Sequence, residues 1–206
     1  MYTQPSRAYR AGRFLLPALL LASFAAAPSA RAEESFDDLV ANLKSPTART
    51  RESAAMALGK TRRREAVAPL SELVRDPEPR VRMAVVDALR QLRDTSGVPA
   101  LVTSLQDGDP DVRDEAISAI VEIYGDRERG GPIDRFLETF SDEYDRTSIA
   151  PYTTVDPAVY RGLAGALRDE KKAVRAHSAY AIGILGGSSV SRDLVGALQD
   201  PEADVR

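Results

Sequence analysis

The chain is built on a repeat with a period of 31 residues, and this repeat limits the fold more than any other feature of the sequence. The arginine column of the repeat comprises Arg51, Arg82, Arg113, Arg175 and Arg206. The apolar column comprises Leu43, Val74, Leu105, Phe136, Leu167 and Leu198. Two further columns in the same register are Asp76, Asp107, Asp169 and Asp200, and Val81, Val112, Val174 and Val205. A fixed period of this length is typical of proteins that stack one supersecondary unit on the next.

Each unit has the pattern of two short helices. In "DPEPRVRMAVVDALRQL", apolar residues recur at helical spacing, at Val81, Ala84, Val85, Ala88, Leu89 and Leu92. Asp76 is placed to cap this helix, with Pro77 at its first position. The preceding "VAPLSELVR" predicts a shorter first helix. One unit buries too little apolar surface to offset its conformational entropy, so neighbours must share their apolar faces. The sequence therefore predicts an all-α solenoid, a superhelix of stacked antiparallel helix pairs.

Residues 1–32 have the composition of a secretory signal peptide. Arg7, Arg10 and Arg13 precede an apolar run over 14–27, and Ala30-Arg31-Ala32 fits a cleavage site after Ala32. The apolar run is shorter than the ~20 residues that cross a bilayer. We therefore expect a chain in the periplasm or outside the cell, with no membrane span after cleavage and with a repeat solenoid over 33–206.

The charge of the expected mature chain argues against nucleic acid as a partner. Removing 1–32 takes away four Arg and no acid, so Lys+Arg falls from 28 to 24 against 31 Asp+Glu and the net charge changes from −3 to −7. Nucleic-acid binding depends mainly on neutralising phosphates with Lys and Arg. The absence of Cys excludes a disulfide framework. No cofactor is expected.

The fourth repeat, around 125–157, is degenerate. The spacing from Arg113 to Arg175 is two whole periods, which predicts a unit that keeps its place in the stack but has lost its second helix. Pro151 stands where an apolar helix residue belongs, so an irregular segment is expected from about residue 142 to 156, and Asp156-Pro157 would start the next helix. Tyr144 and Tyr152 of this segment favour a binding loop. The alternative is that their rings fill the space of the lost helix.

The last repeat, 190–206, is incomplete. The chain reaches Arg206 where a second helix should be starting, which leaves Leu194 and Leu198 without their expected cover. We expect this sequence to be a fragment of a longer repeat protein. The alternative is an end that a partner covers.

The segments "LVRDPEPRVRMAVVDALRQL" and "LRDEKKAVRAHSAYAIGILG" resemble short HEAT repeats of the phycobilin-lyase-like type. The resemblance extends over 39–206 and concerns the fold more than any activity. It implies a structural ladder in which the Asp and Arg columns link neighbouring turns. The ladder residues would be Asp76, Arg82, Asp107, Arg113, Asp169 and Arg175.

The inventory of catalytic groups is small. His177 is the only histidine and lies in the apolar pattern of a second helix, so we expect a packing residue at the edge of the core. A zinc site usually draws on several His or Cys residues. Ser188, Ser189 and Ser191 lack a nucleophile elbow, and Ser191 is expected to cap the following helix. The basic cluster Arg62–Arg64 predicts a solvated turn, with an acidic partner surface as the alternative.

"DGDPDV" places Asp107, Asp109 and Asp111 at alternating positions, as at the start of a calcium loop. The EF-hand pattern then requires Gly and Glu where this chain has Val112 and Ser118. We expect no metal site here. Asp107 belongs to the aspartate column, and Asp109 is placed to cap the helix that begins at Pro110.

Binding surfaces of solenoids form from repeated positions on one helix face. On the second helices, the positions outside the apolar stripe are mixed in charge, with several acids. They include Glu52, Met56, Asp87, Gln91, Asp114, Glu122 and Tyr180. These residues predict a protein partner with a basic or mixed surface; the alternative is an ordinary solvated face. The predicted function is a non-enzymatic scaffold or adaptor of the cell envelope. An accessory factor or lyase acting on a cofactor-bearing protein is the alternative.

Overall fold

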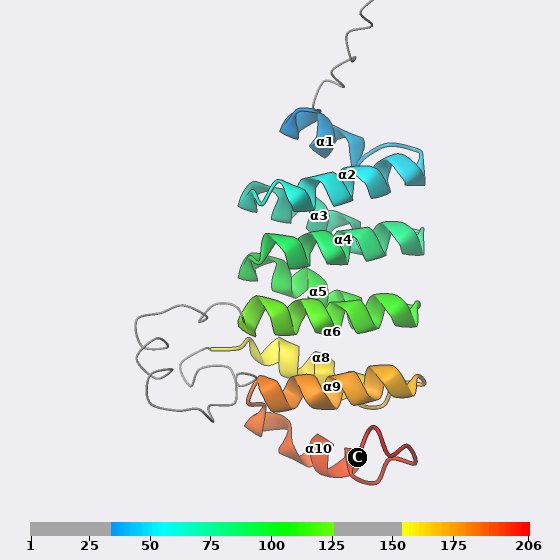
Figure 1. Ribbon diagram of the computed structural model, residues 1–206, viewed down its shortest axis with the longest axis vertical. Helices are drawn as coiled ribbons and strands as arrows, with labels where there is room; N and C mark the ends of the chain where they lie inside the picture. The colour runs from blue at the N-terminus through cyan, green and yellow to red at the C-terminus, as the bar shows by residue number, and fades with distance from the viewer. Residues whose placement is uncertain (1–33, 126–153) are drawn as a thin grey trace, which may run out of the picture. The chain divides into compact units, whose positions relative to one another are not determined.

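The structure is a computed structural model that describes residues 34–125 and 154–206. Helices stack on one another through these residues (Figure 1). The first helices of the repeats are α1 (Phe36–Asn42), α3 (Val67–Ser71), α5 (Val98–Ser104), α8 (Pro157–Ala166) and α10 (Ser191–Ala197). The second helices are α2 (Ala48–Lys60), α4 (Pro79–Leu92), α6 (Pro110–Gly125) and α9 (Lys172–Ile184). Short 3-10 helices adjoin them at Arg64–Ala66, Glu72–Arg75, Thr95–Gly97 and Ser188–Val190. The predicted all-α solenoid is confirmed.

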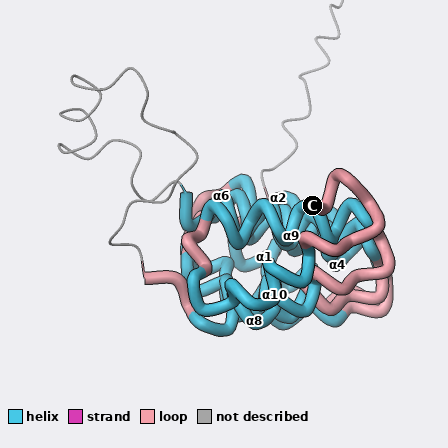
Figure 2. The backbone as a smooth tube through the Cα atoms, turned by 90° about the horizontal axis from the view of Figure 1, so that it is seen from below, coloured by secondary structure: helices cyan, strands magenta, loops and turns pink. Residues whose placement is uncertain are grey.

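The helices form two layers. Along the stack, α2 contacts α4, α4 contacts α6, and α6 contacts α9, so the second helices make one layer. The first helices make the other, and Figure 2 shows the two layers as separate rows. The apolar stripe predicted for α4 lies between them, since Val81, Val85 and Leu89 are at most 1% exposed. No helix of residues 34–125 and 154–206 is long and apolar enough to cross a membrane.

Small residues let the second helices approach closely. A Cβ added to Gly59 of α2 would lie 2.8 Å from the Cα of Ala88 in α4. Ala55 and Ala88 are both completely buried. Contact at backbone distance leaves no room for a larger side chain, so the small residues of the repeat determine how tightly this layer packs.

Four predicted helix starts can be compared directly with the structure, and two of them differ. Asp109 and Asp156 accept backbone N–H groups at the starts of α6 and α8, at 2.9 and 2.7 Å, as predicted. The prediction for Asp76 and Pro77 is wrong. The helix α4 begins two residues later, at Pro79, and Asp76 accepts hydrogen bonds from Arg51 and from the N–H of Glu78. Either proline suits the first position of a helix, so the pattern could not distinguish them.

The prediction that Ser191 caps α10 is also wrong. Ser191 is the first residue of the helix, and its hydroxyl donates to the carbonyl of Ser188 at 2.6 Å. The 3-10 helix at Ser188–Val190 leads directly into α10, so the hydroxyl completes that turn and does not accept from the helix.

The described helices on the two sides of the predicted fourth repeat contact each other. The helix α6 is the direct neighbour of α9, and α5 is the direct neighbour of α8. A Cβ added to Gly162 of α8 would lie 2.6 Å from Leu105 Cδ1, which shows how closely the two first helices approach. Among the described residues, the repeat of α5 and α6 is therefore in direct contact with the repeat of α8 and α9. Tyr144, Tyr152 and most of the predicted irregular segment lie outside the described residues.

The second helices end at one repeat position, with one exception. Arg62 and Arg93 have φ of 53° and Gly186 has φ of 69°, and the three residues belong to a single column of the repeat. This left-handed conformation is a common helix ending. Tyr124 occupies the same column in α6, where the helix continues to Gly125. Tyr124 is buried and its hydroxyl accepts from the N–H of Asp156 at 3.3 Å, so the end of α6 lies beside the start of α8.

Candidate protein-binding face

Arginine–aspartate pairs connect each repeat to the next. Arg82 donates from Nε and Nη2 to both carboxylate oxygens of Asp107, at 2.6 and 2.7 Å. Its Nη1 donates to the carbonyl of Asp76 in its own repeat, at 2.8 Å. The side chains of Arg82 and Asp107 are only 14% and 5% exposed. This bidentate geometry suits the planar guanidinium, which presents several donors in a fixed fork.

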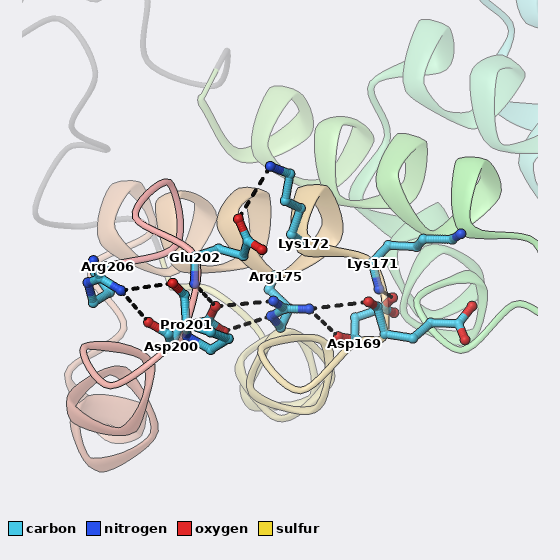
Figure 3. A network of polar contacts seen from close by, with 9 residues as sticks. Asp169, Lys171, Lys172, Arg175, Asp200, Pro201, Glu202 and Arg206 are labelled. Atoms are coloured by element: carbon cyan, nitrogen blue, oxygen red, sulfur yellow. Dashed lines mark hydrogen bonds and ion pairs between the residues drawn. The ribbon is translucent and has the colours of Figure 1, made fainter.

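The same arrangement recurs along one edge of the stack. Its other members are the pairs Arg51–Asp76, Arg113–Asp169 and Arg175–Asp200. Figure 3 shows Arg175 between Asp169 and Asp200, with its bonds to both. We call this set of pairs the ladder. Because the ladder carboxylates already accept two arginine donors each, they are poorly suited to hold a ligand.

The pKa values of the ladder carboxyls follow from this geometry. Burial alone would raise the pKa of Asp107 and of Asp169. The hydrogen bonds from Arg82 and Arg113, together with a backbone N–H donor for each carboxylate, outweigh burial and lower both pKa values. Both carboxyls are thus held in the charged form, which is the form that pairs with arginine.

A second charged cluster lies on the second helices, centred on Arg90 of α4. Arg90 donates to Glu115 at 3.0 Å and to Glu122 at 2.9 Å, both on α6. It also donates to Asp87 one turn earlier on its own helix. Gln91 donates to Asp87 at 2.7 Å. Of the predicted binding residues, Asp87, Gln91 and Glu122 are therefore brought together, and they are already paired.

Arg90 and Glu115 were missed from the sequence. The signal was present, because Arg90 and Glu115 are 25 residues apart, the spacing that also separates Arg82 from Asp107. A search for opposite charges at this offset would have found them. The hydrogen bonds of the cluster link α4 to α6 at the surface of the second-helix layer. They also hold the charged side chains of the cluster in defined positions.

Neighbouring groups shift the ionisation of this cluster. Burial alone would raise the pKa of Glu122, but hydrogen bonds from Arg90 and Arg93 outweigh it and lower that pKa. Burial raises the pKa of Glu115, and the nearby carboxylates of Asp87 and Asp114 add to this effect against the attraction of Arg90. The hydrogen bonds to Glu122 and Asp87 raise the pKa of Arg90. The carboxylates exceed the cations, so the cluster has an acidic character.

Asp114 and His177 make the corresponding link between α6 and α9. His177 Nδ1 lies 2.8 Å from an Asp114 carboxylate oxygen. The two side chains are 26% and 43% exposed, so the pair lies at the surface. His177 was expected only to pack at the edge of the core. It also makes a polar contact with Asp114, which the apolar pattern did not indicate.

Two large apolar side chains flank the charged cluster. Met56 on α2 is 42% exposed and Tyr180 on α9 is 57% exposed. Met56, Asp87 and Tyr180 occupy one column of the repeat, so they take equivalent positions on α2, α4 and α9. Glu52 lies 3.8 Å from Arg80 in a more exposed pair. We call the surface formed by Glu52, Met56, Asp87, Arg90, Gln91, Asp114, Glu115, Glu122 and Tyr180 the second-helix face.

Metal ligands are not assembled in the described part of the chain. Residues 34–125 and 154–206 contain no group of three or more His, Asp or Glu side chains placed to hold an ion. Asp107 and Asp109 have other roles, since Asp107 accepts from Arg82 and Asp109 caps α6. Tyr144 and Tyr152, the other predicted partner-binding residues, lie outside the described residues.

Comparisons with known proteins agree with this architecture. Residues 36–128 match the family model described as HEAT repeats. No curated protein sequence matches the chain. A computationally designed armadillo repeat protein for modular peptide recognition is similar in structure, with a TM-score of 0.51 and 17% identity over 82% of this chain and 77% of that chain.

Two further solved structures are similar. The designed armadillo repeat protein YIII(Dq.V1)4CPAF, solved in complex with peptide (KR)4, has a TM-score of 0.51 and 18% identity over 82% of this chain and 77% of that chain. The complex of CpcE and CpcF of phycocyanin lyase from Nostoc sp. has a TM-score of 0.44 and 22% identity over 84% of this chain and 73% of that chain. The stacked helix pairs define an α-solenoid. Within it, residues 36–128 are similar to HEAT repeats.

Proposed function

We propose that this protein is a non-enzymatic adaptor of the cell envelope that binds a partner protein through the second-helix face. The observation that carries the proposal is the ordered charged cluster around Arg90, flanked by the exposed side chains of Met56 and Tyr180. Aromatic and Met side chains are enriched at protein interfaces, and an ordered polar cluster loses little side-chain entropy on binding.

The chemistry of this face favours a partner with basic groups near apolar ones. Asp87, Glu115 and Glu122 outnumber the cations that they contact, and Asp114 adds a further carboxylate. The solved complex of a designed armadillo repeat protein with peptide (KR)4 shows that a scaffold of this general fold can hold a basic peptide. Export of this protein is proposed from the signal-like composition of residues 1–32.

Affinity capture tests the binding face. The bait is the chain from Glu33 onward, incubated with an envelope fraction of its own cell. We expect a partner that the wild-type bait retains and that the double variant Met56→Asp, Tyr180→Asp loses. The matched control is the double variant Glu72→Ala, Arg75→Ala, because these exposed residues lie on the first-helix layer. Equal capture by both double variants would refute the assignment of the face.

Two further measurements test the other parts of the proposal. Fractionation and N-terminal sequencing should find the protein in the envelope, with Glu33 as its first residue. Recovery of an uncleaved chain from the cytoplasm would contradict export. The accessory-factor or lyase alternative stays a prediction, and a spectral titration of the mature chain with tetrapyrroles tests it, since an adaptor that binds only protein should cause no spectral change.

A further inference from the structure

A basic surface lies on the outside of the first-helix layer, at α8 and α10. Arg161 lies in α8, Arg168 lies just beyond the end of that helix, and Arg192 lies in α10; all three are exposed. Arg168 Nη2 donates to Asp193 of α10 at 2.8 Å, so the two helices lie side by side at this surface. Among the described residues, Asp193 is the one carboxylate that pairs with any of the three arginines. The surface is therefore positive, although the expected mature chain is acidic overall.

Two glycines lie between these arginines. Gly165 and Gly196 occupy one column of the repeat, one turn after Arg161 and Arg192 on the same side of their helices. Among the described residues, Gly186 is the one glycine with a positive φ, and a Cβ added to Gly165 or Gly196 would meet nothing within 4 Å. Inside a helix, glycine is destabilising relative to alanine. Neither backbone conformation nor packing therefore explains these two glycines. We call Arg161, Gly165, Arg168, Arg192 and Gly196 the basic face.

The basic face lies on the outer surface whether or not further repeats follow. Ala68 and Pro99 occupy the column of Arg192 in α3 and α5, and both are exposed although repeats pack on either side of them. Gly165 is open although α10 follows α8. A repeat packed on the far side of α10 would therefore leave Arg192 and Gly196 uncovered.

We propose that the basic face docks an acidic helix of a partner protein. Arg161 and Arg168 are seven residues apart in sequence, which is about 10 Å along α8 at about 1.5 Å per residue. Carboxylates two turns apart on one side of a partner helix have the same separation. Packed helices lie about 8–10 Å apart, depending on the side chains between them, and the bare backbone at Gly165 allows the closer approach. Arg192 supplies the donors for a third carboxylate.

The basic face is specific to one part of the stack and is separate from the second-helix face. Glu72 and Thr103 stand in the glycine column in α3 and α5, so the earlier repeats lack this combination of arginine and glycine. The second-helix face belongs to the other layer, and the partner proposed for it is basic. Each proposal can therefore fail without the other.

The test measures, by amide NMR, the binding of an alanine-rich helical peptide to the full chain at low salt, because salt screens exposed charges. The peptide carries two glutamates seven positions apart, on one side of its helix. We expect chemical-shift changes at the amides of Gly165 and Gly196. Arg161→Ala and Arg168→Ala should each weaken binding about two- to fivefold, as is typical of exposed ion pairs. Gly165→Gln should weaken it about tenfold or more, because the added side chain blocks the approach of the helix.

The matched control is Gly183→Gln. Gly183 is an exposed, open glycine of α9 in the second-helix layer, so its substitution should leave binding unchanged. Both glutamine variants should raise the urea midpoint, because glutamine favours a helix more than glycine does, so lost binding cannot come from unfolding. Equal binding by the wild type and Gly165→Gln would overturn the proposal, as would equal binding of a peptide with its glutamates on opposite sides. Tighter binding of anionic phospholipid vesicles than of the peptide, unchanged by Gly165→Gln, would overturn it in favour of a membrane surface.

Discussion

Two junctions of the stack can be compared directly, the one from α4 to α6 and the one from α6 to α9. Arg82 and Asp107 are 25 residues apart, whereas Arg113 and Asp169 are 56 apart, yet both pairs have an Nε–Oδ2 distance of 2.6 Å. The first helices before and after the longer connection are equally well packed, since Leu101 of α5 and Leu163 of α8 are both completely buried.

The comparison shows that complementary surfaces, and not adjacency in sequence, decide which repeats stack. Both junctions have buried apolar side chains and an arginine opposite an aspartate. The entropic cost of a longer connection grows slowly, by about 0.6 kcal/mol for each doubling of its length. The burial of apolar side chains at the α6–α9 junction stabilises the fold by more than that entropic cost.

The largest effect should come from cavities on the two sides of the longer connection. Leu101→Ala and Leu163→Ala each remove a completely buried side chain from equivalent positions, and each should lower the free energy of unfolding by about 3 kcal/mol. Urea denaturation measures both. Val195→Ala is the control, because its exposed side chain should contribute at most about 0.5 kcal/mol. A much smaller loss for Leu163→Ala would show that the α6–α9 junction is weaker than the regular one.

The next effect should come from the ladder. Asp107→Asn and Asp169→Asn keep the shape of the side chain but remove the charge opposite Arg82 and Arg113. Each should destabilise by about 1.5 to 3 kcal/mol, because the charge-assisted hydrogen bonds are largely shielded from water. The measurement is again the free energy of unfolding. If the two losses differ by more than about 1 kcal/mol, the junctions are not equivalent.

Acid should weaken both junctions, by less than these substitutions. The folded-state pKa values of Asp107 and Asp169 are lowered, so these groups stabilise the fold above the unfolded pKa of about 4 and lose that contribution as the pH falls through the folded values. Stability should therefore fall when urea denaturation is repeated at pH 3 instead of pH 7. The Asn variants should lose less than the wild type. An equal loss in all three proteins would assign the acid sensitivity to other groups.

The smallest effect should come from the surface links between second helices. Glu115→Gln alters the tie between α4 and α6, and His177→Gln alters the tie between α6 and α9. Each should change the free energy of unfolding by about 0.5 kcal/mol or less, because partly exposed ion pairs contribute little. For Glu115, relief of the burial that raises its pKa offsets part of the loss. A loss above 1 kcal/mol for either variant would place that link among the main stabilising contacts.

Most of the fold was predictable from the period and the apolar stripe. Val81, Val85 and Leu89 were expected in the core and are buried. Their helical spacing places them on one face of α4, and the stack of repeats covers that face. The fourth repeat was not predictable in the same way. A spacing of 62 residues between Arg113 and Arg175 keeps the register whether or not the intervening residues occupy a place in the stack.

The sequence predicted which residues lie on the candidate binding face, but it did not predict the ion pairs and hydrogen bonds that these residues form. Asp87, Gln91 and Glu122 were expected outside the apolar stripe of the second helices, and they are half-buried there. Their pairing with Arg90 depends on how far long side chains reach across neighbouring helices. The spacing of apolar residues along one helix does not encode that reach. The tie between Asp114 and His177 spans 63 residues and requires knowing that α6 and α9 are neighbours.

The two edges of the stack differ in how much the length of their connections can change during evolution. At the ladder edge, each arginine donates to the carbonyl of a residue six positions earlier, as Arg82 does to Asp76 and Arg113 does to Asp107. An added residue in such a turn would separate a donor from its acceptor and break a link between repeats. The longer connection instead follows Gly125, at the other end of α6. Lineages of this protein should therefore gain and lose sequence after the second helices, while the turns that precede them keep a constant length.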